Sequence, residues 1–525
     1  MEGIPMRIIL GFLLLVTTSL VISCDNNQLP SSVNVYKHGY QAGNDNRSGS
    51  LAINGPFPSE NIQLLSHLEN WQMGIQFCRA NTTTKAPFPL KDPNNPRATS
   101  PITNDNWGWT DPKTGIPYAL IMSINQGLVV VRIRDPKHPE PLGVISFPGF
   151  VIPTIDNCRK NLVTTQLDHG DVNVYKNHAY VIYEDYWGKA PGPGMMVIDL
   201  TQLRQRKACD PSHPNSCILK VKTKIYHQFR KISSNQTIDF SDGHKIAISE
   251  QSGYMYIATA STPKDIIEKR DRPLKTLVLK INSHNPMQVN WIDTLNLPAH
   301  NIQAVTYQGP DREHRNKEII FLANGYPGKP PFREDLKVVQ ITNQHGQYDY
   351  KLLSAGKYPL GIFGHTVWIT PDFKYAIYGD ENDEYSPILH WFVPNTARDI
   401  IFDIHDLDHI KYLYSYRSKV NSVDHNHFVV GKLLYNSDFT AGLRIVDISG
   451  IDKRQIKEIA YLDTEPRLND FSYKQPAAKA FKKLFSHHDG SQLGSWSNYP
   501  FFKNGLIMVT DQLNGLFVLR IKHKP

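Results

Sequence analysis

From about residue 104 onward, short runs of aliphatic and aromatic residues alternate with turns, and helical periodicity is scarce. One pattern recurs, in which a Gly or polar turn precedes an aliphatic run that ends near Asp or another polar residue. Its seven copies lie at 127–135, 195–200, 276–281, 336–341, 399–404, 442–448 and 515–521. The pattern predicts an all-β fold built from a repeated unit of a few strands.

A second apolar strand generally precedes a copy of this pattern, as at 179–183, 254–258, 318–322, 375–378 and 506–510. Two consecutive apolar strands suit the inner strands of a propeller blade, because neighbouring blades cover both faces of its sheet. Repetition of a small sheet that cannot bury both faces alone indicates radial repetition. We therefore expect a single β-propeller of about seven blades, with six or eight as alternatives, closed by strands from both ends of the chain.

Two segments lie outside the repeat. Residues 24–60 are rich in Asn, Ser, Gly and Pro, which predicts a tether, and the propeller is expected to occupy residues 61–525. Residues 476–488 begin with Pro476-Ala-Ala-Lys-Ala-Phe-Lys-Lys-Leu-Phe485, which predicts a short amphipathic helix inserted near 476–488. This helix either decorates a loop or binds a partner.

The first residues have the features of a targeting signal. Arg7 precedes an almost wholly apolar or small run over 8–22, which predicts a secretory signal peptide over residues 1–23. Val21-Ile-Ser-Cys24 is similar to a bacterial lipobox, so we expect lipidation of Cys24. The protein is then an extracytoplasmic lipoprotein, anchored to the membrane at the cell envelope or surface. If Cys24 instead follows an ordinary cleavage site, the protein is secreted.

Charge and cysteine content indicate which partners and which disulfides to expect. Lys and Arg number 57 against 49 Asp and Glu, but the excess is spread along the chain, so no nucleic-acid partner is expected. Four cysteines follow Cys24, an even number that is compatible with two disulfides in an oxidising compartment. The turn-rich loop from Cys209 to Cys217 suits one bridge, and Cys78 with Cys158 is the other by elimination.

Five histidines recur just before the strand that opens a unit: His169, His244, His300, His365 and His425. The innermost strand of a propeller blade lines the central channel, so equivalent positions at its start meet around one mouth. Neutral imidazoles that converge there, with Asp168, Asp171, Asp242 and Asp424 adjacent, could bind a divalent metal such as zinc. In the alternative interpretation, each histidine forms hydrogen bonds with the neighbouring blade and fixes blade packing.

A second candidate metal site is the acidic segment after residue 378. Asp380, Asp383 and Glu384, together with Glu381, offer the oxygen ligands that calcium prefers, although their spacing is not that of an EF-hand. A solvated acidic loop without an ion is the alternative.

Several longer motifs resemble those of a known protein family. They are Asn104-Asp-Asn-Trp-Gly-Trp-Thr-Asp-Pro-Lys-Thr-Gly115, Tyr307-Gln-Gly-Pro-Asp311, Gly379-Asp-Glu-Asn-Asp-Glu384, Asp424-His-Asn-His427 with Thr440-Ala-Gly-Leu-Arg-Ile-Val-Asp447, and Gly494-Ser-Trp-Ser-Asn-Tyr-Pro-Phe-Phe502. Together they resemble the choice-of-anchor B proteins, whose blades carry LVIVD repeats, over about residues 60–521. The resemblance implies an extracytoplasmic, surface-anchored β-propeller and supplies no reaction. The 476–488 insert and the Cys209–Cys217 loop depart from the family's usual pattern.

The sequence contains no Gly-x-Ser-x-Gly elbow, phosphate loop or His-Glu-x-x-His motif. We therefore expect a surface binding module, without enzymatic activity, that takes a protein, peptide or glycan partner. The alternative function is a metal-dependent hydrolase that uses the His/Asp ring at the channel mouth. A purely architectural role for the histidines is a third interpretation.

Overall fold

A computed structural model describes residues 57–75, 103–124, 126–147, 169–184, 192–211, 213–264, 275–325, 336–344, 347–385, 396–466 and 492–522. The chain divides into two compact units, residues 1–39 and 40–525, and every described residue belongs to the second. The signal peptide with Cys24, the predicted helix at 476–488, Asp168, Cys78 and Cys158 all lie outside the described residues. Among the described residues, no helix combines the length and apolar character needed to span a bilayer.

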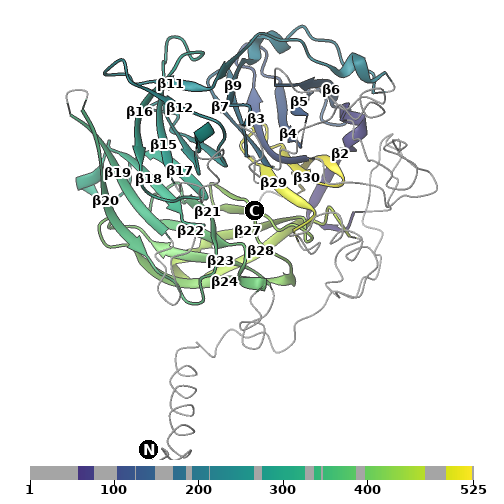
Figure 1. Ribbon diagram of the computed structural model, residues 1–525. Coiled ribbons are helices and arrows are strands. Elements are labelled where there is room, and N and C mark those ends of the chain that lie inside the picture. The colour runs from purple at the N-terminus through teal and green to yellow at the C-terminus, as the bar shows by residue number, and fades with distance from the viewer. Residues whose placement is uncertain are drawn as a thin grey trace, which may run out of the picture. The chain divides into compact units, whose positions relative to one another are not determined.

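Seven antiparallel sheets surround a central axis in the described part of the chain, and each sheet is one blade of a β-propeller (Figure 1). The innermost strands of blades 1 to 7 are β3 (Thr103–Thr110), β7 (His169–Tyr175), β13 (Lys245–Ile248), β17 (Asn301–Thr306), β21 (Gly364–Ile369), β25 (His427–Val430) and β29 (Ser495–Tyr499). The second strands are β4 (Pro117–Ser123), β8 (His178–Glu184), β14 (Tyr254–Ala258), β18 (Glu318–Ala323), β22 (Tyr375–Asp380), β26 (Leu433–Ser437) and β30 (Ile507–Asp511).

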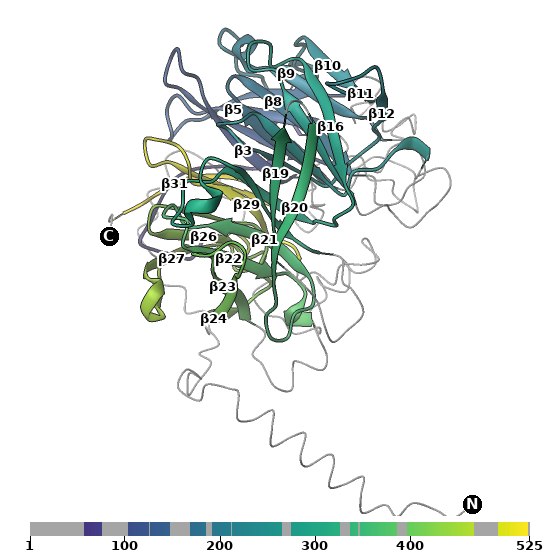
Figure 2. The same cartoon turned by 90° about the vertical axis from the view of Figure 1, so that its left-hand side faces the viewer.

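The outer halves of the blades follow the same order. The third strands are β5 (Gly127–Arg132), β9 (Met195–Asp199), β15 (Thr276–Ile281), β19 (Leu336–Gln344), β23 (Thr396–Asp403), β27 (Leu443–Gly450) and β31 (Gly515–Ile521). The fourth strands are β6 (Glu140–Ile145), β10 (Thr223–Tyr226), β16 (Val289–Leu295), β20 (Gln347–Gly356), β24 (Lys411–Asn421), β28 (Gln455–Leu462) and β2 (Ile62–Leu68). In the side view of Figure 2, the antiparallel strands β19 and β20 of blade 4 lie side by side.

A few short elements complete the described structure. The strand β1 (Ser59–Glu60) extends blade 6 by pairing with β28, and β11 (Gln228–Arg230) pairs with β12 (Thr237–Asp239). The 3-10 turns are η1 (Asn70–Met73), η2 (Leu200–Leu203), η3 (Pro214–Cys217), η4 (Arg312–His314), η5 (Asp383–Tyr385) and η7 (Ile451–Lys453).

Strands from both ends of the chain close the ring, as the sequence predicted. In blade 7, β2 pairs with β31 in a register that sets Ile62 opposite Ile521. Figure 1 shows the purple β2 beside the yellow strands of blade 7. The innermost strands β29 and β3 also contact each other, so the last blade packs on the first.

The seven recurrent aliphatic runs are the third strands of the seven blades, and the other apolar runs are the second strands. Both kinds lie in the middle of a blade and are covered on both faces. In β4, Leu120 packs against blade 2 whereas Ala119 and Ile121 pack against blade 7, as the two-residue period of a strand requires. Burial of one such leucine stabilises the fold by about 2 kcal/mol. The innermost strands are more polar, as in His169-Gly-Asp-Val-Asn-Val-Tyr175.

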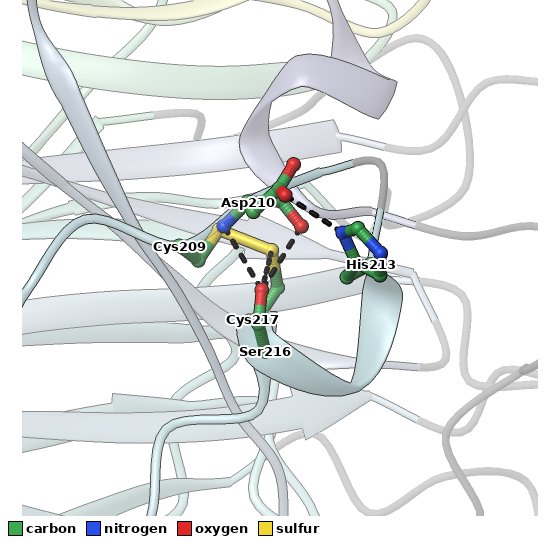
Figure 3. Close-up of a disulfide and its surroundings, with 5 residues drawn as sticks. All are labelled: Cys209, Asp210, His213, Ser216 and Cys217. Carbon is green, nitrogen blue, oxygen red and sulfur yellow. Dashed lines mark hydrogen bonds and ion pairs between the residues drawn. A yellow bond between two sulfur atoms is a disulfide. The ribbon is translucent and has the colours of Figure 1, made fainter.

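A disulfide joins Cys209 and Cys217, the pair expected from the loop between them (Figure 3). The loop is further held by Asp210, which pairs with His213 and exchanges hydrogen bonds with Ser216. It belongs to blade 2, yet the backbone N–H of Cys209 donates to the carbonyl of Pro141 in blade 1. The disulfide loop therefore caps the outer edge of the neighbouring blade.

Candidate metal centre at the channel mouth

The five predicted histidines converge at one mouth of the channel, each from a different blade. His169 opens β7, His365 is the second residue of β21, and His244, His300 and His425 stand directly before or within two residues of β13, β17 and β25. All five line a single cavity of about 20 Å³, which has room for one water-sized particle. The convergence follows from the repeat, because each blade starts its first strand at the same mouth.

The remaining two blades complete the circle with different residue types. Trp496, the second residue of β29, and Asp105, in β3, line the same cavity. The ring centroids of His244 and His300 are 4.0 Å apart, those of His300 and His365 4.3 Å, and those of His365 and His425 4.3 Å. Trp496 continues the series, at 4.6 Å from His425 and stacked at 5.0 Å on His169. Six aromatic rings thus surround the cavity.

Hydrogen bonds fix which nitrogen of three histidines carries the proton. His300 Nδ1 lies 3.3 Å from the carbonyl oxygen of His365, and His425 Nδ1 lies 2.6 Å from that of Trp496. A carbonyl oxygen only accepts, so each Nδ1 is the donor and the neutral ring keeps a lone pair on Nε2. His244 Nδ1 is held in the same way by the Glu184 carboxylate, 2.5 Å away. A histidine that binds a metal typically has its other nitrogen held by such an acceptor.

These three bonds also join neighbouring blades. His300 binds blade 5, His425 binds blade 7 and His244 binds blade 2. The two interpretations of the histidines are therefore compatible, because Nδ1 links the blades while Nε2 remains available.

Two carboxylates stand behind the histidines, at the ends of second strands that return to the same mouth. Glu184 closes β8, and Glu381 follows β22. His169, Glu184 and His244 each offer a ligand atom within 4.8 Å of the others, and so do His300, His365 and Glu381. The sequence predicts Glu381 in a calcium segment, whereas its position directly after a second strand is the signal that assigns it to the mouth.

Burial determines the protonation states of the histidines and of Glu381. It holds the pKa values of His300 and His365 well below the ordinary range and lowers that of His425 to about 3. The three imidazoles are therefore neutral at physiological pH, which is the form that binds metals. Burial also raises the pKa of Glu381 to about 8. A bound cation would favour the ionised carboxylate.

Lys245 lines the cavity and was not predicted from the sequence. Its ammonium group contacts Asp105 and lies 3.2 Å from Asp171. These two aspartates come from blades 1 and 2, whereas Lys245 comes from blade 3. The carboxylates of Asp105 and Asp171 are thus paired with an ammonium group, so they are not the acids that a metal at this mouth would use.

The segment predicted to bind calcium is buried. Asp380 is completely inaccessible, and its carboxylate accepts hydrogen bonds from the Tyr358 hydroxyl and from the backbone N–H groups of Ile362 and Phe363. Asp383 pairs with Arg398, at 2.6 Å, and Glu384 is 5% exposed. Asp380 is therefore saturated by protein donors, whereas Asp383 and Glu384 belong to a separate acidic group described below.

No protein-family model and no curated protein matches the chain. Two solved structures similar to it are a crystal structure of a nidogen/laminin complex and that of a functionally unknown protein from Desulfotomaculum acetoxidans. The first is 11% identical, covers 67% of this chain and 94% of its own, and has a TM-score of 0.33. The second is 12% identical, covers 69% of this chain and 89% of its own, and has a TM-score of 0.37.

Proposed function

We propose that the protein is an extracytoplasmic binding module whose channel mouth holds one zinc ion. The observation that carries the proposal is the convergence of five histidines on one cavity, where the Nδ1 atoms of His244, His300 and His425 are bonded to neighbouring blades. His300, His365 and Glu381 are the ligands that we assign. The Nδ1 atom of His365 supports this choice, because it is buried without a hydrogen-bond partner.

The proposed role of the ion is to bind a partner group at the channel mouth. Two histidines and a glutamate form a ligand set that zinc accepts, with a fourth position for water or a partner group. The cavity among the described residues, with a volume of about 20 Å³, suits a single ion.

The location and the partner rest on the sequence. The signal over residues 1–23, the lipobox-like Cys24 and the resemblance to surface-anchored LVIVD propellers support attachment to a membrane outside the cytoplasm. A protein, peptide or glycan at the cell surface is the class of partner that we propose.

Elemental analysis by mass spectrometry tests the metal. The full chain, purified without a polyhistidine tag, is compared with the His300→Ala/His365→Ala variant. The control is His405→Ala/His409→Ala, since both of these side chains are exposed. We expect near-stoichiometric zinc in the wild type and the control, and its loss from a first variant that still shows the circular dichroism of the wild type. Absence of zinc from the wild-type protein would refute the metal proposal.

A further inference from the structure

A second group of acids lies between blades 5 and 6. Asp383 and Glu384 belong to η5, which follows β22, and Asp424 lies just before β25. The three side chains offer ligand atoms within 4.8 Å of one another. Their exposed fractions are 6%, 5% and 3%, so the group is screened from water.

Most of the oxygens in this group lack a partner. Both carboxylate oxygens of Glu384, both of Asp424 and Oδ1 of Asp383 are buried without a hydrogen bond of acceptable geometry. Neighbouring Asp380 shows the contrast, since two backbone N–H groups and a hydroxyl saturate its carboxylate. A buried carboxylate without donors costs several kcal/mol, so these oxygens require a cation or protons.

The local charge balance indicates the charge of that cation. Arg398 and Arg417 are the cations that pair with this group, through Asp380 and Asp383. Asp380, Asp383, Glu384 and Asp424 face these two guanidinium groups, and Asp399 and Asp438 add to the negative charge around Asp424. Carboxylates therefore outnumber the paired guanidinium groups when all are ionised, which favours a cation of more than one charge.

We propose that Asp383, Glu384 and Asp424 bind a calcium ion that clamps blade 5 to blade 6. Calcium takes six to eight oxygen ligands, and the group offers five unpartnered carboxylate oxygens, with no ring nitrogen or sulfur among them. Zinc prefers the nitrogen-rich set at the channel mouth. The clamp differs from the segment expected from sequence, because Asp424 takes the place of Asp380. It does not depend on the zinc proposal.

Calorimetric titration of the full chain with calcium, after treatment with a chelator, tests the clamp. We expect one calcium ion per chain and a higher melting temperature when calcium is present. The isosteric variants Asp424→Asn and Glu384→Gln should each weaken calcium binding at least tenfold. The matched control Asp452→Asn removes an exposed acid from blade 6 and should bind calcium as the wild type does.

Three outcomes would overturn the inference. If the wild type binds no calcium, protons neutralise the acids instead. If it binds calcium but Asp424→Asn and Glu384→Gln bind it equally well, the ion sits elsewhere. If the His300→Ala/His365→Ala variant loses calcium as well as zinc, the ion belongs to the channel mouth. Retention of calcium by that variant separates the clamp from the proposed zinc site.

Discussion

The buried carboxyl group of Glu318, which belongs to neither proposed metal site, should make stability depend on pH. Glu318 opens β18 and is 8% exposed. Its oxygens receive hydrogen bonds from the hydroxyls of Ser249, at 3.1 Å, and Tyr256, at 3.2 Å. These neutral donors compensate only part of the lost hydration, so burial raises the pKa of Glu318 to about 7.

The sign follows from comparing the folded and unfolded chains. The unfolded carboxyl has a pKa of 4.5, so the folded protein holds this proton more tightly. The stabilisation is complete below pH 4.5 and is lost as the pH rises through about 7. At about 1.4 kcal/mol for each pH unit, the full loss is about 3 kcal/mol.

Urea unfolding of the wild type and Glu318→Gln, followed by tryptophan fluorescence at pH 5 and pH 8, measures this contribution. Gln is isosteric with the protonated acid, so the two proteins should have similar free energies of unfolding at pH 5. At pH 8 the variant should be the more stable by about 3 kcal/mol. The control Glu313→Gln removes an exposed acid of η4 and should show no such difference. A wild-type-to-variant difference that is the same at both pH values would refute the reasoning.

Four further substitutions test the packing of the blades. Gly442 has φ +75°, and an added Cβ would lie 2.1 Å from the carbonyl oxygen of Leu462, whereas Gly431, with φ +61°, has open space around it. Gly431→Ala should cost about 1 to 2 kcal/mol from backbone strain and Gly442→Ala clearly more, as urea unfolding would show; equal costs would contradict the predicted clash. Cys209→Ser should lower the free energy of unfolding by about 2.5 kcal/mol, and a reducing agent should then destabilise the wild type by about that much more than this variant. Tyr183→Phe removes the hydroxyl that donates to the buried carbonyl of Ser123, so its melting temperature should fall by an amount equivalent to about 1 kcal/mol; an unchanged value would mean that the Gln126 N–H, whose nitrogen lies 3.3 Å from the same oxygen, satisfies the carbonyl by itself.

The sequence by itself determined the architecture. A strand covered on both faces must be apolar throughout, so the second and third strands of the blades stand out as continuous aliphatic runs such as Thr276–Ile281. Seven such runs give seven blades. Because the repeat sets equivalent positions at one mouth, the histidines from His169 to His425 were also foreseeable as a ring.

Only the tertiary structure decided which groups complete each site. Trp496 and Asp105 line the same cavity as the histidines. Because they are not histidines, the recurrence of His in the sequence does not identify them. Asp424 replaces Asp380 among the proposed calcium ligands because backbone N–H groups saturate the Asp380 carboxylate, whereas the Asp424 oxygens have no hydrogen-bond partner. Hydrogen bonding, rather than distance along the chain, makes this difference. Asp424 lies 40 residues beyond Glu384 in the sequence and reaches it only because blades 5 and 6 pack face to face. A sequence pattern indicates which residues are buried, whereas donors, partners and charge balance come from the contacts between blades.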